Sequence, residues 1–142
     1  MIYSLYGQPG SGKTTLAKLL AAHLATPHLL DGDEFRTLFK NAGYGWRGRQ
    51  KNIRAVNAVA TYLNRTQPLP VVMAFVNPFE YLRVELKANN PDLVCVFLKT
   101  QRKLRAEFHV EKFQPGSPDI FLPTDTRRTV TFSRLLAALN NV

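Results

Sequence analysis

The chain has little cysteine and no long apolar run, and each shortage excludes a class of protein. Its 142 residues include one cysteine, Cys95, so no internal disulfide can form. Cys95 lies in an apolar stretch, which predicts a buried, unreactive thiol in a reducing compartment. No apolar run approaches the roughly 20 residues that cross a bilayer, and the first residues do not have the pattern of a signal peptide. We therefore expect a cytoplasmic protein that does not bind a membrane.

Acidic residues are also few, which makes the chain strongly basic. Nineteen Lys and Arg residues stand against ten Asp and Glu residues, for a formal net charge of +9 at pH 7. Such an excess is typical of proteins that bind a polyanion such as nucleic acid. A generally basic surface that keeps the protein soluble explains it equally well, because net charge says little about fold or specificity. Both interpretations stay open.

Apolar residues alternate between continuous runs and helical spacing along the whole chain. The runs predict strands at residues 2–6, 28–30, 71–76, 93–98 and 120–122. Helical spacing predicts helices at residues 13–24, 34–40, 50–64, 78–87 and 129–139, with a loop at 41–48. Strands that alternate with helices predict a three-layer α/β fold with a parallel sheet of about five strands flanked by helices. No repeat or linker interrupts the pattern, so one domain over residues 1–142 is expected.

Residues 7–14, Gly-Gln-Pro-Gly-Ser-Gly-Lys-Thr, match the phosphate-binding loop pattern G-x-x-x-x-G-K-[ST] at every position. Its glycines allow backbone amides to approach phosphate oxygens, and the following helix adds positive potential. Lys13 is expected to reach the β- and γ-phosphates, and Thr14 to hold Mg²⁺. The predicted nucleotide-binding residues are Gly7, Gly10, Ser11, Gly12, Lys13, Thr14, Thr15 and, farther along, Arg102. A glycine-rich turn without a ligand is the alternative, and the intact spacing makes it a poor one.

Phosphate loops occur in kinases, GTPases and ATPases, and three features favour a kinase. The chain is short for a motor protein, and it lacks the Asn-Lys-x-Asp motif that reads guanine. The strand at 71–76 ends in Asn77-Pro78, without the acidic residue of a Walker B strand. Mg²⁺ is therefore expected to bind Thr14 and Asp33, and ATP to be the phosphoryl donor.

The loop, Asp31/Asp33 and Asn77 each follow a predicted strand. Parallel sheets bind ligands at the carboxyl ends of their strands, so we expect these residues to converge. A carboxylate there can deprotonate an attacking hydroxyl, and Arg36 can hold an acceptor phosphate or sulfate. The alternative for Asp33 is a helix N-cap.

Three segments in order resemble the adenylylsulfate (APS) kinase family: residues 7–14, then Leu30-Asp31-Gly32-Asp33 with Arg36, then Arg49-x-x-Asn52-Ile53-Arg54. The resemblance covers about the first two thirds of the chain, and Thr124-Asp125-Thr126 is also similar. It implies that Asp33 is the base and a metal ligand, with Asp31 beside it. It further implies acceptor binding by Arg36, Arg49 and Asn52, to which we add Trp46, Phe75 and Asn77 as candidates. For Arg49 and Asn52 the residues alone favour a solvated helix face.

The chain departs from that family in its lid. Asn77-Pro78-Phe79 replaces the usual Ser-Pro-Tyr, and the motifs Lys-Gly-Leu-Tyr and Phe-Thr-Gly are missing. Residues 99–118 form a short basic lid segment instead, in which Arg102 is predicted to contact ATP and Arg105 to act in catalysis. An ordinary basic helix face is an equal alternative. In this respect the chain is similar to short, divergent family members of phages, and the host cytoplasm would then be its location.

Three functions fit these observations. The preferred one is an ATP-dependent kinase that phosphorylates a hydroxymethylated pyrimidine (5-hydroxymethyluracil) in DNA, which suits the charge and the cations around Trp46. APS kinase of sulfate assimilation is the alternative, and it best explains residues 31–52. A module that binds nucleotide or nucleic acid without catalysis is the third. The sequence leaves oligomeric state open, including a homodimer.

Overall fold

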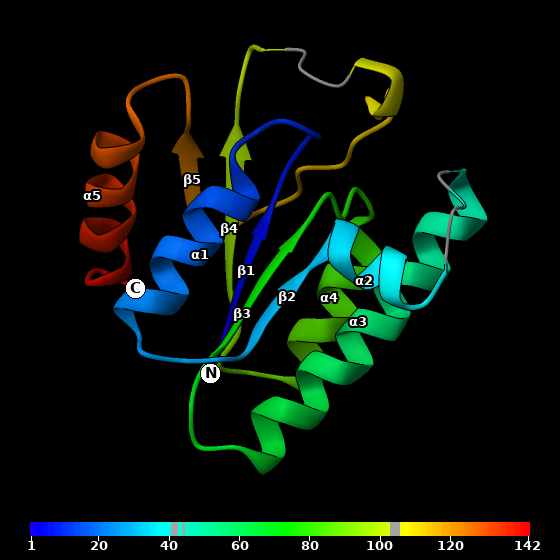
Figure 1. The fold of residues 1–142 in the computed structure, drawn as a ribbon, viewed down its shortest axis with the longest axis horizontal. Helices are drawn as coiled ribbons and strands as arrows, with labels where there is room; N and C mark the ends of the chain where they lie inside the picture. Colours follow the sequence, from blue (N-terminus) through cyan, green and yellow to red (C-terminus); the bar gives the residue numbers. More distant parts are fainter. Residues whose placement is uncertain (41–42, 44, 103–105) are drawn as a thin grey trace.

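Figure 1 shows the computed structural model of the chain, which describes residues 1–40, 43, 45–102 and 106–142. The strands of this described part form one sheet: β1 (Ile2–Tyr6), β2 (Leu29–Asp31), β3 (Val71–Phe75), β4 (Val94–Lys99) and β5 (Ile120–Pro123). Their order across the sheet is β2-β3-β1-β4-β5, and each neighbouring pair is parallel. The carboxyl ends of the strands therefore meet at one edge of the sheet.

Helices cover both faces of this sheet. They are α1 (Lys13–His23), α2 (Gly32–Leu38), α3 (Trp46–Thr66), α4 (Glu80–Asn89) and α5 (Arg128–Leu139). In Figure 1, α1 and α5 lie on one side of the sheet, and α2, α3 and α4 lie on the other. This arrangement confirms the predicted three-layer α/β fold with a five-stranded parallel sheet.

The interior strand β3 is continuously apolar because both of its faces are covered. Val72 and Ala74 pack into the core beneath α1 and α5, whereas Val71, Met73 and Phe75 pack into the core beneath α3 and α4. Successive side chains of a strand point to opposite faces, so a strand with two covered faces needs apolar residues at every position. The continuously apolar sequence of residues 71–76 therefore indicates a strand that is covered on both faces.

Helix α2 begins earlier than expected because the cap is Asp31. The Asp31 side chain accepts hydrogen bonds from the backbone N–H groups of Asp33 and Glu34. These bonds satisfy donors that a helix start leaves without partners. The alternative assignment of Asp33 as the N-cap is therefore wrong, because Asp31 holds that position.

Helix α3 also begins earlier than predicted, because residues 46–48 are helical rather than part of a loop. The Arg49 backbone N–H donates to the Gly45 carbonyl at 3.0 Å, and this bond closes the first turn. Trp46 packs edge-on against Phe79, with 4.3 Å between ring centroids. This packing of the indole stabilises the added turn. The glycine-rich local sequence gives no sign of it, because Phe79 is distant in the sequence.

The helices and the single cysteine bear on two expectations from the sequence. In the part of the chain that the structure describes, every helix is too short or too polar to cross a membrane. Cys95 lies in β4, and burial raises the pKa of its thiol to about 11. Few thiolates form at neutral pH with such a pKa, which agrees with the predicted unreactive cysteine.

Replacement of Leu86 by alanine tests the packing of α4 against the sheet. Leu86 is 2% exposed, and its truncation is expected to lower the free energy of unfolding by about 2–5 kcal/mol. Val84 lies on the same helix but is 61% exposed, so Val84→Ala should change that free energy by about 0.5 kcal/mol or less. Urea unfolding of both variants measures the difference. Equal effects would contradict this packing.

Candidate active site

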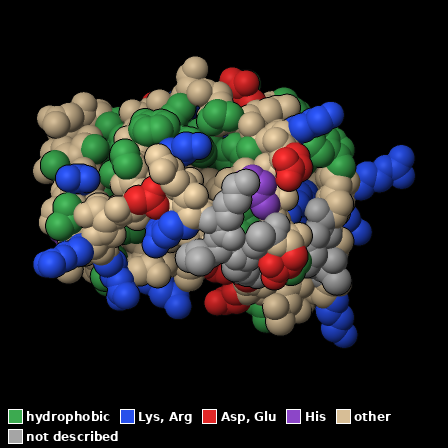
Figure 2. All heavy atoms as spheres, turned by 90° about the horizontal axis from the view of Figure 1, so that it is seen from above, with side chains coloured by type: hydrophobic (Ala, Val, Ile, Leu, Met, Phe, Trp, Pro, Cys, Tyr) green, Lys and Arg blue, Asp and Glu red, His purple; other side chains and the backbone are tan. Residues whose placement is uncertain are grey.

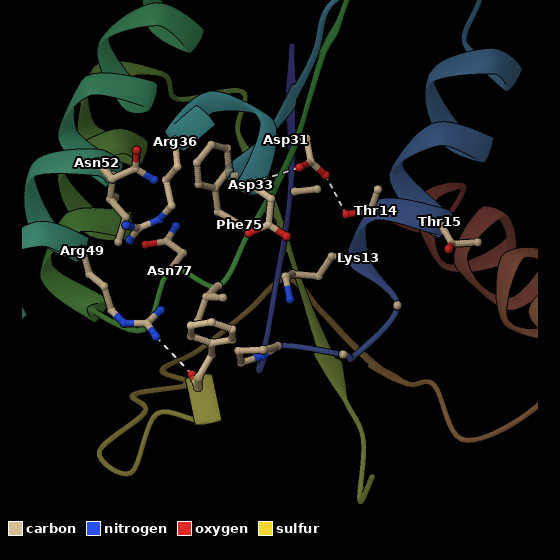
Figure 3. Close-up of a pocket in the computed structure, with 18 residues that line it drawn as sticks. Lys13, Thr14, Thr15, Asp31, Asp33, Arg36, Arg49, Asn52, Phe75 and Asn77 are labelled. Atoms are coloured by element: carbon tan, nitrogen blue, oxygen red, sulfur yellow. Dashed lines mark hydrogen bonds between the residues drawn. The ribbon is translucent and has the colours of Figure 1, made fainter. Parts of the chain in front are cut away.

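A cavity of about 280 Å³ opens at the carboxyl edge of the sheet. Twelve of the residues predicted to bind nucleotide, metal or acceptor line it together: Gly10, Gly12, Lys13, Thr14, Thr15, Asp31, Asp33, Arg36, Arg49, Asn52, Phe75 and Asn77. In Figure 3 the phosphate loop and α1 stand on one side, α3 stands on the other, and the two aspartates lie between them. The sequence segments that the resemblance singled out thus meet in one cavity.

The phosphate loop has the backbone that its glycines predict. Gly12 has a φ of 95°, in the left-handed region that side chains disfavour, and its position for a Cβ has no neighbouring atom within 4 Å. Gly7 is needed for a different reason, because a Cβ there would lie 2.5 Å from the Leu98 carbonyl oxygen. The loop therefore keeps open space next to Gly12, where a phosphate chain fits against backbone amides.

Lys13 is held by the loop itself. Its Nζ donates to the Gln8 carbonyl oxygen at 2.8 Å and to the Ser11 hydroxyl at 3.3 Å. Ser11 is buried and does not line the cavity, and neither does Gly7. Nucleotide binding by Gly7 and Ser11 stays a prediction.

The contact between Thr14 and Asp31 is the feature that suits a metal ion. Thr14 Oγ1 donates to Asp31 Oδ2 at 2.6 Å. A hydroxyl beside a carboxylate offers hard oxygen ligands, and Mg²⁺ takes few protein ligands in addition to substrate phosphates. Among the described residues no cluster of three or more acidic, His or Cys side chains competes for this role. The structure thus brings Asp31, rather than Asp33, to Thr14, while metal binding by Thr14 and Asp33 stays a prediction.

The far side of the cavity holds two buried cations. Arg36 and Arg49 are each 8% exposed. Arg36 Nη1 donates to the Gly43 carbonyl at 2.6 Å, and Arg49 Nη2 donates to the Phe108 carbonyl at 3.0 Å. These bonds fix the guanidinium groups at the cavity wall, where they create positive potential for an anion.

Two amide side chains on that wall have acceptor atoms without partners. Asn52 is 4% exposed and Asn77 is 1% exposed, yet neither Oδ1 accepts a hydrogen bond. Buried polar atoms are normally paired, and an unpaired one costs free energy. Because both residues line the cavity, a ligand with N–H or O–H groups can satisfy them.

Asn77 is held in an unusual conformation by residues that sequence reasoning missed. Its φ is 48°, and its carbonyl accepts from Arg83 Nη1 at 2.5 Å. The Arg83 guanidinium lies 4.3 Å from the centre of the Tyr6 ring, and burial lowers its pKa. Burial also raises the pKa of Tyr6 to about 12, so Tyr6 keeps its proton and donates to the Pro115 carbonyl at 2.6 Å. Nothing in the local sequence links these positions.

Trp46 and Arg102 lie outside the cavity. Trp46 is outside the cavity, in an adjoining hollow with Phe79. Arg102 also lies outside it and pairs with Asp125, at 3.2 Å from Nε to Oδ1. The Thr100 hydroxyl and the Gln101 amide, together with Arg102, hold the pKa of Asp125 below its usual range. Arg105 falls outside the described residues. The roles proposed for Arg102 and Arg105 stay predictions.

The parallel sheet, the phosphate loop and the cavity at the strand ends define the class of the protein, which has a P-loop kinase fold. The family model for adenylylsulphate kinase matches residues 1–111, so the chain belongs to the adenylylsulphate kinase family.

Solved structures share this fold over nearly the whole chain. The APS kinase CysC of Mycobacterium tuberculosis, in complex with AMPPNP and APS, has a TM-score of 0.79 and 23% identity, over 98% of this chain and 96% of that chain. The shikimate kinase of Aquifex aeolicus has a TM-score of 0.72 and 16% identity, over 99% and 97%. Likeness at such identities shows the fold alone.

Curated relatives match a much shorter stretch. The adenylate kinase of Chlamydia caviae is 48% identical over 42 residues, which are 30% of this chain and 20% of that enzyme. The cytidylate kinase of Halobacterium salinarum is 50% identical over 38 residues, which are 27% and 20%. The matched stretch thus spans about a fifth of the length of these relatives.

Gly12→Ala tests the phosphate loop. A side chain at a left-handed position costs roughly 1–2 kcal/mol, and relaxation of the loop would move the amides, so the Kd for ATP should rise about tenfold or more. Gly45→Ala is the control, because a Cβ there also has no neighbour within 4 Å but φ is −74°. Calorimetry should find its Kd within about twofold of the wild-type value. Equal Kd values for both variants would refute the proposed role of the loop.

Proposed function

We propose that the protein transfers the γ-phosphoryl group of ATP to a hydroxyl group of adenylylsulfate. One observation carries the proposal: the cavity joins a phosphate loop to a wall with two buried guanidinium groups and two unpartnered amide oxygens. The first half suits a triphosphate, and the second suits a small acceptor that is both anionic and rich in hydrogen-bond donors. Membership of the adenylylsulphate kinase family supports the same acceptor.

Adenylylsulfate has the chemistry that this wall requires. Its phosphate and sulfate groups carry negative charge, which Arg36 and Arg49 can stabilise through charge-assisted hydrogen bonds. Its amino group and ribose hydroxyls are donors, and Asn52 and Asn77 present acceptor oxygens without partners. Phe75 and Phe108 line the same cavity and can pack against a purine ring. The cavity volume, about 280 Å³, is close to the lower end for small-molecule sites.

The side chains divide the work of an in-line transfer. Asp33 lies between Asp31 and Lys13 in Figure 3, where it can accept the proton of the attacking hydroxyl. That oxygen then bonds to the γ-phosphorus as the bond to the β-phosphate oxygen breaks, and ADP leaves. Lys13 balances the charge that develops on the phosphate oxygens. Thr14 and Asp31 would hold Mg²⁺, which neutralises phosphate charge when bound.

A modified base in DNA is the second candidate acceptor, and a basic helix favours it. Helix α3 contains Arg47, Arg49, Lys51, Arg54 and Arg65 but no acidic residue. On the face that Figure 2 shows, however, Lys and Arg side chains are scattered among other side chains and do not form one track. The family match also supports adenylylsulfate rather than DNA. Our sequence-based preference for DNA is therefore not supported, and we place this acceptor second.

A transfer assay with labelled ATP separates the candidates. Purified protein with Mg²⁺ is incubated with adenylylsulfate, with DNA that contains 5-hydroxymethyluracil, or with neither. We expect label on adenylylsulfate, and only modest loss of rate between 50 and 200 mM salt. Label on DNA alone, with a steep salt dependence, would overturn the proposed acceptor. ATP binding without any transfer would instead support a non-catalytic module.

Asp33→Asn tests the assigned base. The amide cannot accept the hydroxyl proton, so kcat should fall about 100-fold or more, the scale typical of a lost general base. The Kd for ATP should change little, because the loop is intact. Glu34→Gln is the matched control: Glu34 is the next residue on α2, is exposed and does not line the cavity. Wild-type turnover in Asp33→Asn would refute its role as the base.

A further inference from the structure

Residues 106–118, here named the covering segment, connect the two halves of the cavity. The Phe108 carbonyl, in the 3₁₀ turn Ala106–Phe108, accepts from Arg49 on the acceptor side. Farther along, the Gln114 N–H donates to the Pro78 carbonyl at 3.0 Å, which ties the segment to the end of β3. In Figure 1 the segment passes over the carboxyl edge of the sheet. It can therefore respond to both substrates.

The side chain of Gln8, in the phosphate loop, forms two hydrogen bonds with the covering segment. Gln8 Nε2 donates to the Val110 carbonyl at 2.8 Å, and the Val110 N–H donates to Gln8 Oε1 at 2.9 Å. One planar amide thus pairs with both backbone groups of one residue, much as a neighbouring strand would. A side chain needs a donor and an acceptor in one plane for this, so leucine, which is similar in size, cannot make either bond.

The backbone of Gln8 is linked to the nucleotide side. Its carbonyl oxygen accepts from Lys13 Nζ at 2.8 Å and from the Ser11 N–H at 3.1 Å. Lys13 is the cation expected to reach the β- and γ-phosphates, so a bound triphosphate competes with the Gln8 carbonyl for its ammonium. Loss of that contact would alter the hydrogen bonds of Gln8, the residue that holds Val110.

We propose that Gln8 is a positioning residue that couples nucleotide binding to the acceptor pocket through Val110 and Phe108. A bound triphosphate fixes the conformation of the phosphate loop, and Gln8 then holds the covering segment against Arg49. Bound nucleotide then orders part of the acceptor pocket, so the acceptor loses less conformational entropy of the protein when it binds. Nucleotide and acceptor therefore each tighten the binding of the other. The inference rests on the proposed function in that it requires an acceptor in this cavity.

Calorimetry measures this coupling directly. The Kd for adenylylsulfate is determined with and without saturating AMPPNP and Mg²⁺, for the wild type and for Gln8→Leu. We expect AMPPNP to lower the wild-type Kd about fivefold or more, within the usual range of coupling between sites. In Gln8→Leu that ratio should fall below about twofold, whatever happens to either affinity alone. Gln8→Glu should be intermediate, because it keeps the acceptor for the Val110 N–H but loses the donor.

The exchange rate of the Val110 amide proton provides a readout that needs no acceptor. AMPPNP with Mg²⁺ should slow that exchange in the wild type but not in Gln8→Leu. Gln67→Leu, at an exposed glutamine after α3, should behave as wild type in both measurements. Full coupling in Gln8→Leu, or no effect of AMPPNP on wild-type Val110, would overturn the inference. Gln8-dependent protection of Val110 without any binding of adenylylsulfate would reject the acceptor and support the link through Gln8.

Discussion

The hydrogen bond between Thr14 and Asp31 joins the two parts of the chain on which the site depends. Thr14 lies in the first turn of α1, the helix after β1, and Asp31 ends β2, which lies two places away from β1 in the sheet. Because β1 and β2 both pair in parallel with β3, their carboxyl ends lie at the same edge of the sheet. The same Asp31 side chain caps α2, which places Asp33 and Arg36 on the cavity wall. The phosphate loop, the candidate metal ligands and the candidate acceptor wall are therefore positioned by a common set of contacts.

The fold could be predicted from the sequence because local pattern and burial agree. Continuous apolar runs correspond to strands buried on both faces, and helical spacing corresponds to helices with one buried face. The predicted starts of α2 and α3 were wrong, because both helices begin earlier. The glycines of residues 41–48 suggested a loop, but α3 begins at Trp46, whose ring packs on Phe79. Contacts with residues distant in the sequence decide such boundaries, and local composition does not contain them.

The candidate site, like the fold, contains residues that the sequence predicts and residues that it does not. Residues within recognisable motifs, from Gly10 to Asn52, lie together in the cavity as expected. The contacts of Gln8 and Arg83 could not be predicted from the sequence. Their side chains donate to backbone carbonyl groups, which every residue has, so the partner's residue type gives no information. The preference for a DNA acceptor lacks support for a related reason. The net charge of the chain suggested DNA, whereas the cavity wall and the family match support a small anionic nucleotide.

The central claim is that one cavity holds ATP along the phosphate loop and an acceptor hydroxyl beside Asp33. A crystal structure with AMPPNP, Mg²⁺ and adenylylsulfate tests it most directly. The account predicts triphosphate density along residues 10–14, the anionic groups of adenylylsulfate at Arg36 and Arg49, and one ribose hydroxyl between Asp33 and the γ-phosphate. Adenylylsulfate bound elsewhere, or a hydroxyl that points away from the γ-phosphate, would contradict it.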